Sequence, residues 1–196
     1  MWVTGKRVTN SWAHPDENSS VYELKAYVEN VFARLGLHMH DLVVGNLTDD
    51  IYAAGLSVQT RGGKRLATFG IVTKKLLKAF DIDNEVYYAD FNWKELLKAI
   101  RNVKVSYTEI SKFPAVKRDL ALLLDKKVQF AEIEKIAYET EKKLLKEVSL
   151  FDVYEGKNLE AGKKSYAVSF LLQDENATLN DKQIDKIMSK LVKNLE

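Results

Sequence analysis

The sequence of 196 residues has no cysteine, only two prolines and three histidines. Without cysteine there is no disulfide framework, no thiolate-bound zinc or iron–sulfur cluster and no thiol nucleophile. No apolar run approaches the roughly 18 residues that a membrane-spanning helix needs. The first residues also lack the apolar stretch of a signal peptide. These absences predict a cytoplasmic protein.

The chain also lacks an excess of charge of one sign. It has 30 Lys and Arg residues against 28 Asp and Glu residues, a formal net charge of +2. Any contact with nucleic acid must therefore depend on local patches rather than on global charge. Apolar residues make up 46% of the sequence, and a chain of this length buries enough surface to fold without covalent staples.

No set of side chains marks a catalytic centre. A Ser/His/Asp arrangement is not visible, and the carboxylates are spread along the chain. His38 and His40 would share one face of a strand, but no third ligand lies nearby in sequence, which disfavours a metal site. The segment Gly162-Lys163-Lys164-Ser165 resembles a phosphate-binding loop, yet Lys157 stands where that motif needs glycine. A strand also follows it where the motif needs a helix.

The first half mixes helical and strand-like patterns. Ser20 followed by Glu23 is typical of a helix N-terminus, and apolar residues then recur at helical spacing. Gly62-Gly63 separates two strand-like runs and favours a β-hairpin. The expected elements are a helix from 21 to 35, strands at 54–60 and 65–72, a short helix after Thr73, a strand at 85–91 and a short helix after Asn92.

The second half begins, by its alternating pattern, with a strand at 103–112, and we expect a domain boundary near Asn102. The order that follows is β-α-β-β-α, which is a ferredoxin-like α+β fold without its last strand. The first of these strands would then keep an open edge, so we expect a further strand beyond Glu196. The expected elements are strands at 117–125, 147–154 and 164–173 and helices at 131–146 and after Asn180.

Three blocks are more specific than their periodicity. They read Lys-Phe-Pro-Ala-Val-Lys-Arg-Asp-Leu-Ala at 112–121, Leu-Phe-Asp-Val-Tyr-Glu-Gly at 150–156 and Gly-Lys-Lys-Ser-Tyr-Ala at 162–167. In order and spacing they resemble the ferredoxin-like anticodon-binding domain at the C-terminus of the bacterial phenylalanyl-tRNA synthetase beta subunit. The resemblance runs from about Tyr107 to Glu196. In that family a short closing strand follows the last helix, and it is missing here.

Residues 21–36 and 66–82 are similar to the closing part of the class II synthetase-like module that precedes this domain in the same subunit. The resemblance implies two domains. Residues 1–102 would be the end of a catalytic-like but inactive module with an antiparallel sheet, and residues 103–196 the anticodon-binding domain. The chain would cover about the last quarter of a longer subunit.

The family attaches phenylalanine to its tRNA with ATP and Mg²⁺, in a tetramer of two alpha and two beta subunits whose alpha subunit holds the catalytic centre. The resemblance therefore implies no catalytic residue, no metal site and no cofactor in this chain. The implied partners are the anticodon stem-loop of tRNA(Phe) and the alpha subunit.

For RNA contacts we expect lysines and arginine to neutralise phosphates and aromatic rings to stack on unpaired bases. Other interpretations remain open: Phe113 could be a core residue, Arg118 could pair with Asp119 on the surface, and the lysines could sit in a solvated turn. The RNA-binding candidates are Phe113, Lys117, Arg118, Tyr154, Lys157, Lys163 and Lys164.

Two other functions compete with this one. A free-standing ferredoxin-like domain could bind a small ligand or a protein partner through its sheet, and the fold alone does not separate that case. An acylphosphatase-type enzyme of the same fold is disfavoured, because no Arg and Asn pair is placed as a phosphate cradle in the first loop.

Overall fold

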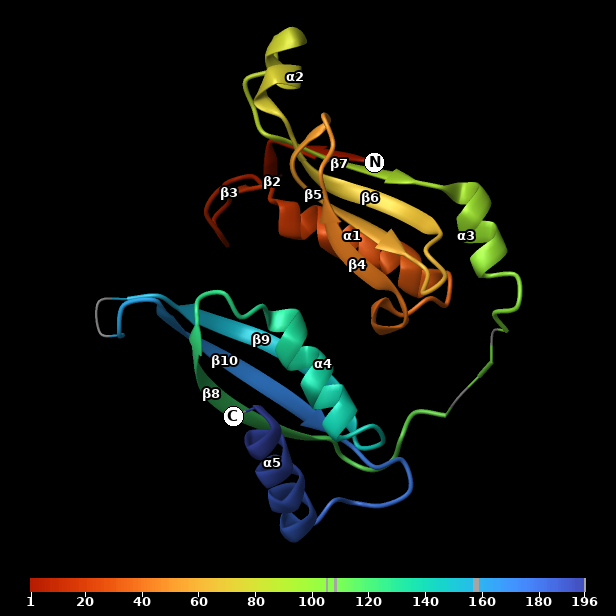
Figure 1. Cartoon of the computed structure of the whole chain (residues 1–196), viewed down its shortest axis with the longest axis vertical. Helices are drawn as coiled ribbons and strands as arrows, with labels where there is room; N and C mark the ends of the chain where they lie inside the picture. The colour runs from red at the N-terminus through yellow and green to blue at the C-terminus, as the bar shows by residue number, and fades with distance from the viewer. Residues whose placement is uncertain (105, 108, 157–158, 196) are drawn as a thin grey trace. The chain divides into compact units, whose positions relative to one another are not determined.

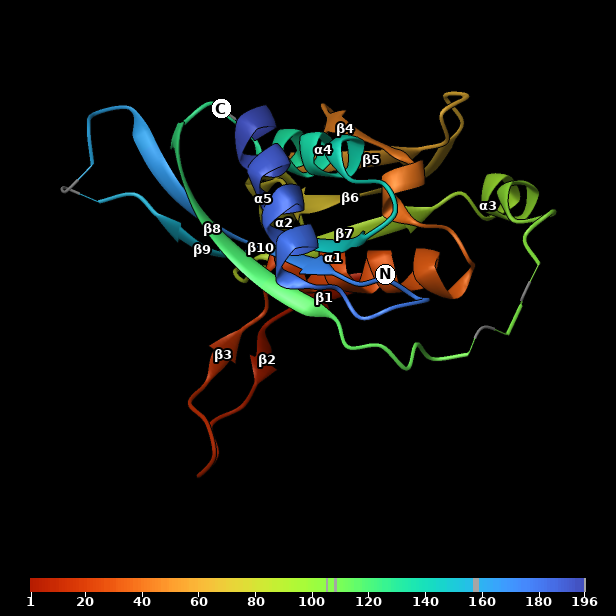
Figure 2. The same ribbon diagram turned by 90° about the horizontal axis from the view of Figure 1, so that it is seen from below.

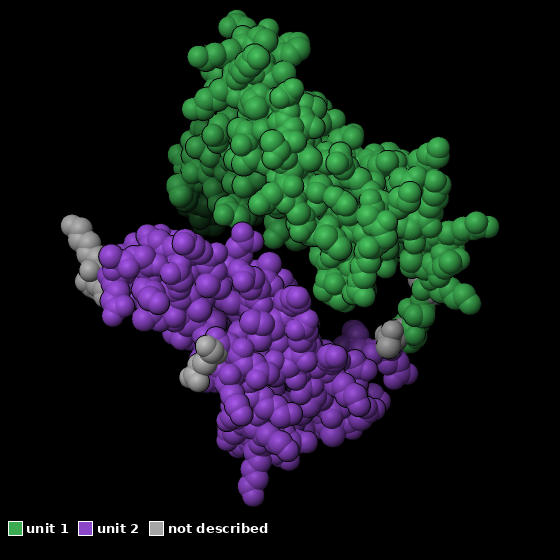
Figure 3. All heavy atoms as spheres, in the orientation of Figure 1, with its two compact units in different colours: residues 1–107 green, residues 108–196 purple. Residues whose placement is uncertain are grey.

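The computed structural model describes residues 1–104, 106–107, 109–156 and 159–195. The chain divides into two compact units, residues 1–107 and residues 108–196, which we call unit 1 and unit 2 (Figure 3). None of the described helices is long and apolar enough to cross a membrane.

Unit 1 is built on a five-stranded antiparallel sheet with the order β1-β7-β6-β5-β4. One helix, α1 (Val21–Arg34), packs against one face of this sheet, as Figures 1 and 2 show. The residues buried between them include Leu24, Val28 and Phe32 of the helix and Phe69 of the sheet. The strands are β1 (Trp2–Thr4), β4 (Val43–Leu47), β5 (Tyr52–Gln59), β6 (Arg65–Val72) and β7 (Val86–Phe91).

Local sequence explains the ends of α1. The Ser20 side chain accepts a hydrogen bond from the backbone N–H of Glu23, which caps the first turn. After the helix, Gly36 adopts a φ of +73°, a conformation that glycine tolerates best. The helix expected from the sequence is thus confirmed.

The other elements of unit 1 are short. The β5–β6 hairpin turns through Gly63, whose φ is +76°, so the expected hairpin is confirmed. The expected strand at His38 and His40 is wrong, because His40 lies in a 3₁₀ turn, η1 (Met39–Asp41), and the two rings stack at 5.4 Å. The remaining elements are β2 (Lys6–Val8), β3 (Glu17–Asn18), α2 (Lys74–Ala79) and α3 (Trp93–Ala99).

Unit 2 has a three-stranded antiparallel sheet with the order β8-β10-β9 and two helices. The chain order is β-α-β-β-α, so the ferredoxin-like α+β expectation is confirmed. Among the residues the structure describes, β8 forms ladder hydrogen bonds with β10 alone, and its other edge is open. The elements are β8 (Val116–Asp125), α4 (Phe130–Thr140), β9 (Leu145–Tyr154), β10 (Lys163–Leu172) and α5 (Asp181–Leu195).

Strand alternation builds the core of unit 2. Along β10 the even-numbered residues are buried, and Val168, Phe170 and Leu172 are fully inaccessible. Ile133 of α4 and Ile184 of α5 are buried in the same cluster. The helices therefore cover one face of the sheet, and the odd-numbered residues of β10 lie on the other face.

Two sequence expectations for this region are wrong. The helix expected at 131–146 ends at Thr140, because the following residues turn and enter β9 at Leu145. The strand expected at 103–112 is not formed by its described residues, which lack regular structure; Val105 and Thr108 lie outside the described residues. An alternating pattern makes a strand only where a neighbouring strand accepts its hydrogen bonds.

Candidate nucleic-acid interface

The uncovered face of the β8-β10-β9 sheet is the strongest candidate for a binding surface. Directly opposed residues of antiparallel strands share a face. Ser165 is opposite Leu123 of β8 and Tyr154 of β9, so these three residues form one row across that face. Leu123 is 57% exposed and Tyr154 is 43% exposed. We call this surface, which carries the odd-numbered residues of β8 and β10, the open face.

A β-bulge in β9 adds a second aromatic ring to the open face. Ala167 pairs with Asp152 while its neighbour Val168 pairs with Leu150, so Phe151 is the extra residue between them. The shift changes which residues of β9 face outward. As a result Phe151, which is 56% exposed, and Tyr154 both lie on the uncovered side.

Lys117 of β8 reaches the Phe151 ring. Its Nζ lies 5.6 Å from the ring centroid, within cation–π distance. This contact joins the outer strands of the sheet across β10. It therefore places a positive charge next to an exposed aromatic ring, a combination suited to a base and its phosphate.

The centre of the open face is shallow and polar. Ala121 and Ala167 are opposed small residues, and Ser169 Oγ donates a hydrogen bond to the Asp119 carboxylate. Asp152 of β9 is paired with Ala167 on its other side, so Ala121, Ala167 and Asp152 form one row across the sheet. Small side chains let a flat ring approach the sheet, and carboxylates can accept hydrogen bonds from exocyclic amino groups of bases.

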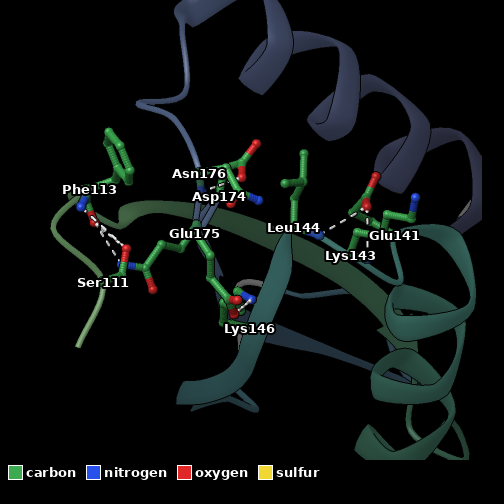
Figure 4. Close-up of polar contacts among 10 residues, drawn as sticks. Ser111, Phe113, Glu141, Lys143, Leu144, Lys146, Asp174, Glu175 and Asn176 are labelled. Carbon is green, nitrogen blue, oxygen red and sulfur yellow. Dashed lines mark hydrogen bonds and ion pairs between the residues drawn. The ribbon is translucent and has the colours of Figure 1, made fainter. Parts of the chain in front are cut away.

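Phe113 lies on the loop before β8. Its backbone oxygen accepts a 2.7 Å hydrogen bond from Nε2 of Gln173, and its N–H donates to Ser111 Oγ at 3.2 Å. Figure 4 shows the ring directed away from these polar contacts. The side chain is half-buried and, among the described residues, is not part of the buried core cluster of unit 2. The anchored backbone gives the ring a defined position.

An ion pair and turn contacts order the end of the sheet where β8 and β9 begin and β10 ends. Lys146 of β9 donates a 2.7 Å hydrogen bond to Glu175 Oε1. The Glu141 carboxylate accepts from the backbone N–H groups of Lys143 and Leu144, each at 3.1 Å (Figure 4). These contacts order the turn into β9 and hold the loop that follows β10.

The structure corrects the placement of Lys164. Sequence analysis made both Lys163 and Lys164 candidates for phosphate contacts, which need exposed side chains, but Lys164 is only 6% exposed. It occupies an even-numbered position of β10, and these positions face the helices. Its Nζ donates a 2.7 Å hydrogen bond to the Tyr166 hydroxyl and lies 4.4 Å from the same ring. Lys163, the partly exposed neighbour, is opposite Asp125.

Lys117 and Arg118 do not act from one surface. Adjacent residues of a strand point to opposite faces, so Arg118 lies on the side that carries the core. Arg118 is half-buried and donates to the backbone oxygen of Lys117 at 3.1 Å. The alternative interpretation of Arg118, a surface ion pair with Asp119, is not among the ion pairs of the described residues, and Asp119 accepts a hydrogen bond from Ser169 instead. Lys157 lies outside the described residues.

No described part of the chain gathers three or more His, Cys, Asp or Glu side chains in a way that could hold a metal ion.

Sequence reasoning missed two members of the open face, Phe151 and Leu123. For Leu123 the signal was present, because the alternation of β8 places its side chain on the other face of the sheet from Leu122 and Leu124. For Phe151 the signal is weaker, because its orientation depends on a bulge that the periodicity does not show.

Comparisons with known proteins agree with this architecture. Residues 111–196 match the family described as ferredoxin-fold anticodon binding domain. Residues 1–93 match the family described as phenylalanyl tRNA synthetase beta chain CLM domain.

Several curated relatives align with the whole chain. A phenylalanine–tRNA ligase beta subunit from Bacteroides fragilis is 86% identical over 196 residues, which are 100% of this chain and 24% of the relative. Its counterpart from Porphyromonas gingivalis is 53% identical over 100% of this chain and 24% of the relative. That of Fusobacterium nucleatum is 34% identical over 97% of this chain and 24% of the relative. The chain thus spans about a quarter of the length of these relatives.

Proposed function

Because the chain belongs to the phenylalanine–tRNA ligase beta-subunit family, we propose that unit 2 binds the anticodon stem-loop of tRNA(Phe). In this proposal the chain is a tRNA-binding and subunit-packing part of a ligase that joins phenylalanine to tRNA with ATP. The observation that carries the proposal is the open face, where Phe151 and Tyr154 remain 56% and 43% exposed on the three-stranded sheet.

Unpaired bases explain why exposed rings suit this role. Anticodon bases are not paired, so their faces are free to stack on aromatic side chains. Stacking contributes about 1–3 kcal/mol per base and depends little on sequence. Phe151 and Tyr154 are therefore the stacking platform of the proposal, and Asp119 and Asp152 the acceptors for base edges.

Phosphate contacts supply the rest of the affinity. Lys117 already lies beside the Phe151 ring, and Lys163 lies at the start of β10. Each phosphate that a lysine neutralises releases condensed counterions and makes the affinity depend on salt. Phe113 and Arg118 remain candidates at the periphery, while the burial of Lys164 argues against a direct contact.

For residues 1–102 we propose the role of the inactive, catalytic-like module that packs against an alpha subunit in an assembly of two alpha and two beta chains. ATP and Mg²⁺ would be bound outside this chain, and the assembly would act in the cytoplasm. Support comes from the match of residues 1–93 to the beta chain CLM family and from the five-stranded antiparallel sheet.

Filter binding of tRNA(Phe) to the chain tests the anticodon proposal. Phe151→Ala and Tyr154→Ala should each weaken binding about tenfold or more, the value of one lost stacking contact. A matched control is Phe80→Ala, which removes a ring that is 72% exposed on unit 1. Equal loss in all three variants, or no loss in the first two, would contradict the proposal.

Copurification with a tagged alpha subunit tests the packing proposal separately. We expect the chain to be retained when the alpha subunit is captured, and the Phe151→Ala variant to be retained equally well. If a fragment of residues 108–196 alone were also retained by the alpha subunit, the packing surface would instead lie on unit 2.

A further inference from the structure

Unit 1 holds a cavity that the proposed tRNA contact does not use. It has a volume of about 250 Å³ and is lined by residues of β5, β6, β7, the loop before β5 and Asn92 after β7. On β7, Tyr88 and Asp90 alternate with Tyr87 and Ala89, which are buried in the core beneath α1. The cavity therefore lies on the sheet face that α1 does not cover.

A row of aromatic rings forms one side of this cavity. The rings of Tyr52 and Tyr88 are 6.2 Å apart and nearly parallel, at 17°. The Tyr88 ring in turn stacks on Trp2 at 3.9 Å. Tyr52 is only 6% exposed, and its hydroxyl lies 3.2 Å from Thr68 Oγ1 at the cavity wall.

Gly55 makes room for the Tyr52 side chain, and Gly70, opposite it, lets the backbones of β5 and β6 approach closely. Gly55 and Gly70 are directly opposed on β5 and β6. A Cβ on Gly55 would lie 3.0–3.3 Å from three atoms of the Tyr52 side chain, and a Cβ on Gly70 would lie 2.2 Å from the Ala54 oxygen. The ring thus lies against bare backbone, which holds it in place beside the cavity.

Carboxylates complete the lining. Asp49 precedes β5, and its Oδ1 accepts a 2.9 Å hydrogen bond from the Ile51 N–H, which orders the loop. Asp90 lies beside Tyr88: burial raises the pKa of the Tyr88 phenol most, followed by the negative charge of Asp90 and a hydrogen bond with it. Within the described ranges, neither carboxylate takes part in an ion pair, so both can accept bonds from a ligand.

We propose that this cavity binds a small organic cation that carries an ammonium or guanidinium group. The two carboxylates supply charge-assisted hydrogen bonds to such a cation, and the side chains of Tyr52 and Tyr88 give its alkyl part an apolar wall. Burial raises the pKa of Tyr52, so this phenol stays neutral and the ring stays apolar at neutral pH. A cavity with aromatic walls and a few convergent polar groups is the usual form of a small-molecule site.

Arg65 also lines the cavity. The effect of its removal shows whether the ligand is a cation or an anion. Two carboxylates and one guanidinium give the lining a formal charge of −1, which favours a cation. Arg65 repels that cation, so its removal must strengthen binding. If the true ligand were an anion or used a carboxylate, Arg65 would attract it and removal would weaken binding.

The experiment is a titration of the 196-residue chain with agmatine, a small dication with an ammonium and a guanidinium group, followed by NMR. We expect saturable shifts with a Kd of about 1 mM or tighter. They should be centred on the backbone amides of Asp49, Thr68 and Asp90. Asp49→Asn and Asp90→Asn should each weaken binding about tenfold, the effect of one lost charge-assisted hydrogen bond.

Asp50→Asn is the matched control. Asp50 follows Asp49 in the chain and is exposed like it, but it is not part of the lining, so this variant should bind like the wild type. Arg65→Gln should tighten binding about two- to fivefold. The proposal fails if agmatine gives no saturable shifts, if Asp50→Asn weakens binding as much as Asp49→Asn, or if Arg65→Gln weakens it. None of these readouts involves tRNA, so they are independent of the anticodon proposal.

Discussion

The ammonium group of Lys164 and the hydroxyl of Tyr166 are joined by a 2.7 Å hydrogen bond inside unit 2. Both side chains project from β10 toward the helices, and the ammonium also lies 4.4 Å from the centroid of the same ring. A lysine in this position contributes its alkyl stem to packing, while its charge is satisfied by the phenol and the ring.

The first prediction concerns stability. Lys164→Ala should lower the free energy of unfolding by about 1–3 kcal/mol, because it removes the packed stem and leaves space in the core. Lys164→Met retains the volume and should recover most of the loss. Urea unfolding followed by circular dichroism measures both. A wild-type midpoint for the Ala variant would mean that Lys164 is not packed as described.

The second prediction concerns salt. Lys163→Ala should reduce the slope of log affinity against log salt for tRNA by about 0.7–0.9, the value of one lost phosphate contact. Lys164→Ala, its buried neighbour, should leave the slope unchanged. Filter binding between low and moderate salt gives both slopes. If only Lys164→Ala reduced the slope, Lys164 and not Lys163 would be the phosphate contact.

The third prediction tests the close approach of β5 and β6. In Gly70→Ala the new Cβ would lie 2.2 Å from the Ala54 oxygen and 2.7 Å from the Gly55 Cα, both backbone atoms. We expect a loss of about 2–4 kcal/mol, since the backbone must shift. In the control Gly45→Ala, the nearest atom is Ser57 Oγ at 3.8 Å, so stability should change little or rise slightly. Thermal melts compare the two.

The fourth prediction concerns alkaline pH. Burial, and then a hydrogen bond to Glu85 at 2.8 Å, raise the pKa of the Tyr87 phenol. The folded chain therefore holds this proton more tightly than the unfolded chain, whose tyrosines titrate near pH 10. The contribution of Tyr87 is complete below about pH 10 and is lost as pH rises through the raised pKa.

Urea unfolding at a series of pH values from about 8 to 11 measures this effect. The free energy of unfolding should fall more steeply above pH ~10 for the wild type than for Tyr87→Phe. Other tyrosines contribute equally to both curves, so the difference isolates Tyr87. Parallel curves would show that the Tyr87 proton is not held by the fold.

Much of unit 2 could be predicted because two of its strands, β8 and β10, alternate regularly between the two faces of the sheet. The same alternation contained the information on Lys164, which stands two residues before Tyr166 and so shares its buried face. The charge of Lys164 suggested an exposed side chain, but its position in the strand places it on the buried face. The two-residue period of a strand places Lys163 and Lys164 on opposite faces of the sheet, and it does the same for Lys117 and Arg118.

Other features could not be predicted because they depend on pairing rather than on pattern. The outward position of Phe151 follows from the bulge opposite Ala167 and Val168. The alternating segment around Val103 has no strand partner among the described residues and stays irregular. The close approach of β5 and β6 beside Tyr52 depends on the pairing of Gly55 with Gly70, which lie 15 residues apart in the sequence and form no local motif.

Each of the two apolar clusters described above takes its buried residues from a single unit: Leu24 to Leu96 in one and Ile133 to Leu191 in the other. Calorimetry should accordingly record two overlapping heat-absorption peaks instead of one, and a substitution in either cluster should move only its own peak. A single melting temperature would then describe neither half of the chain.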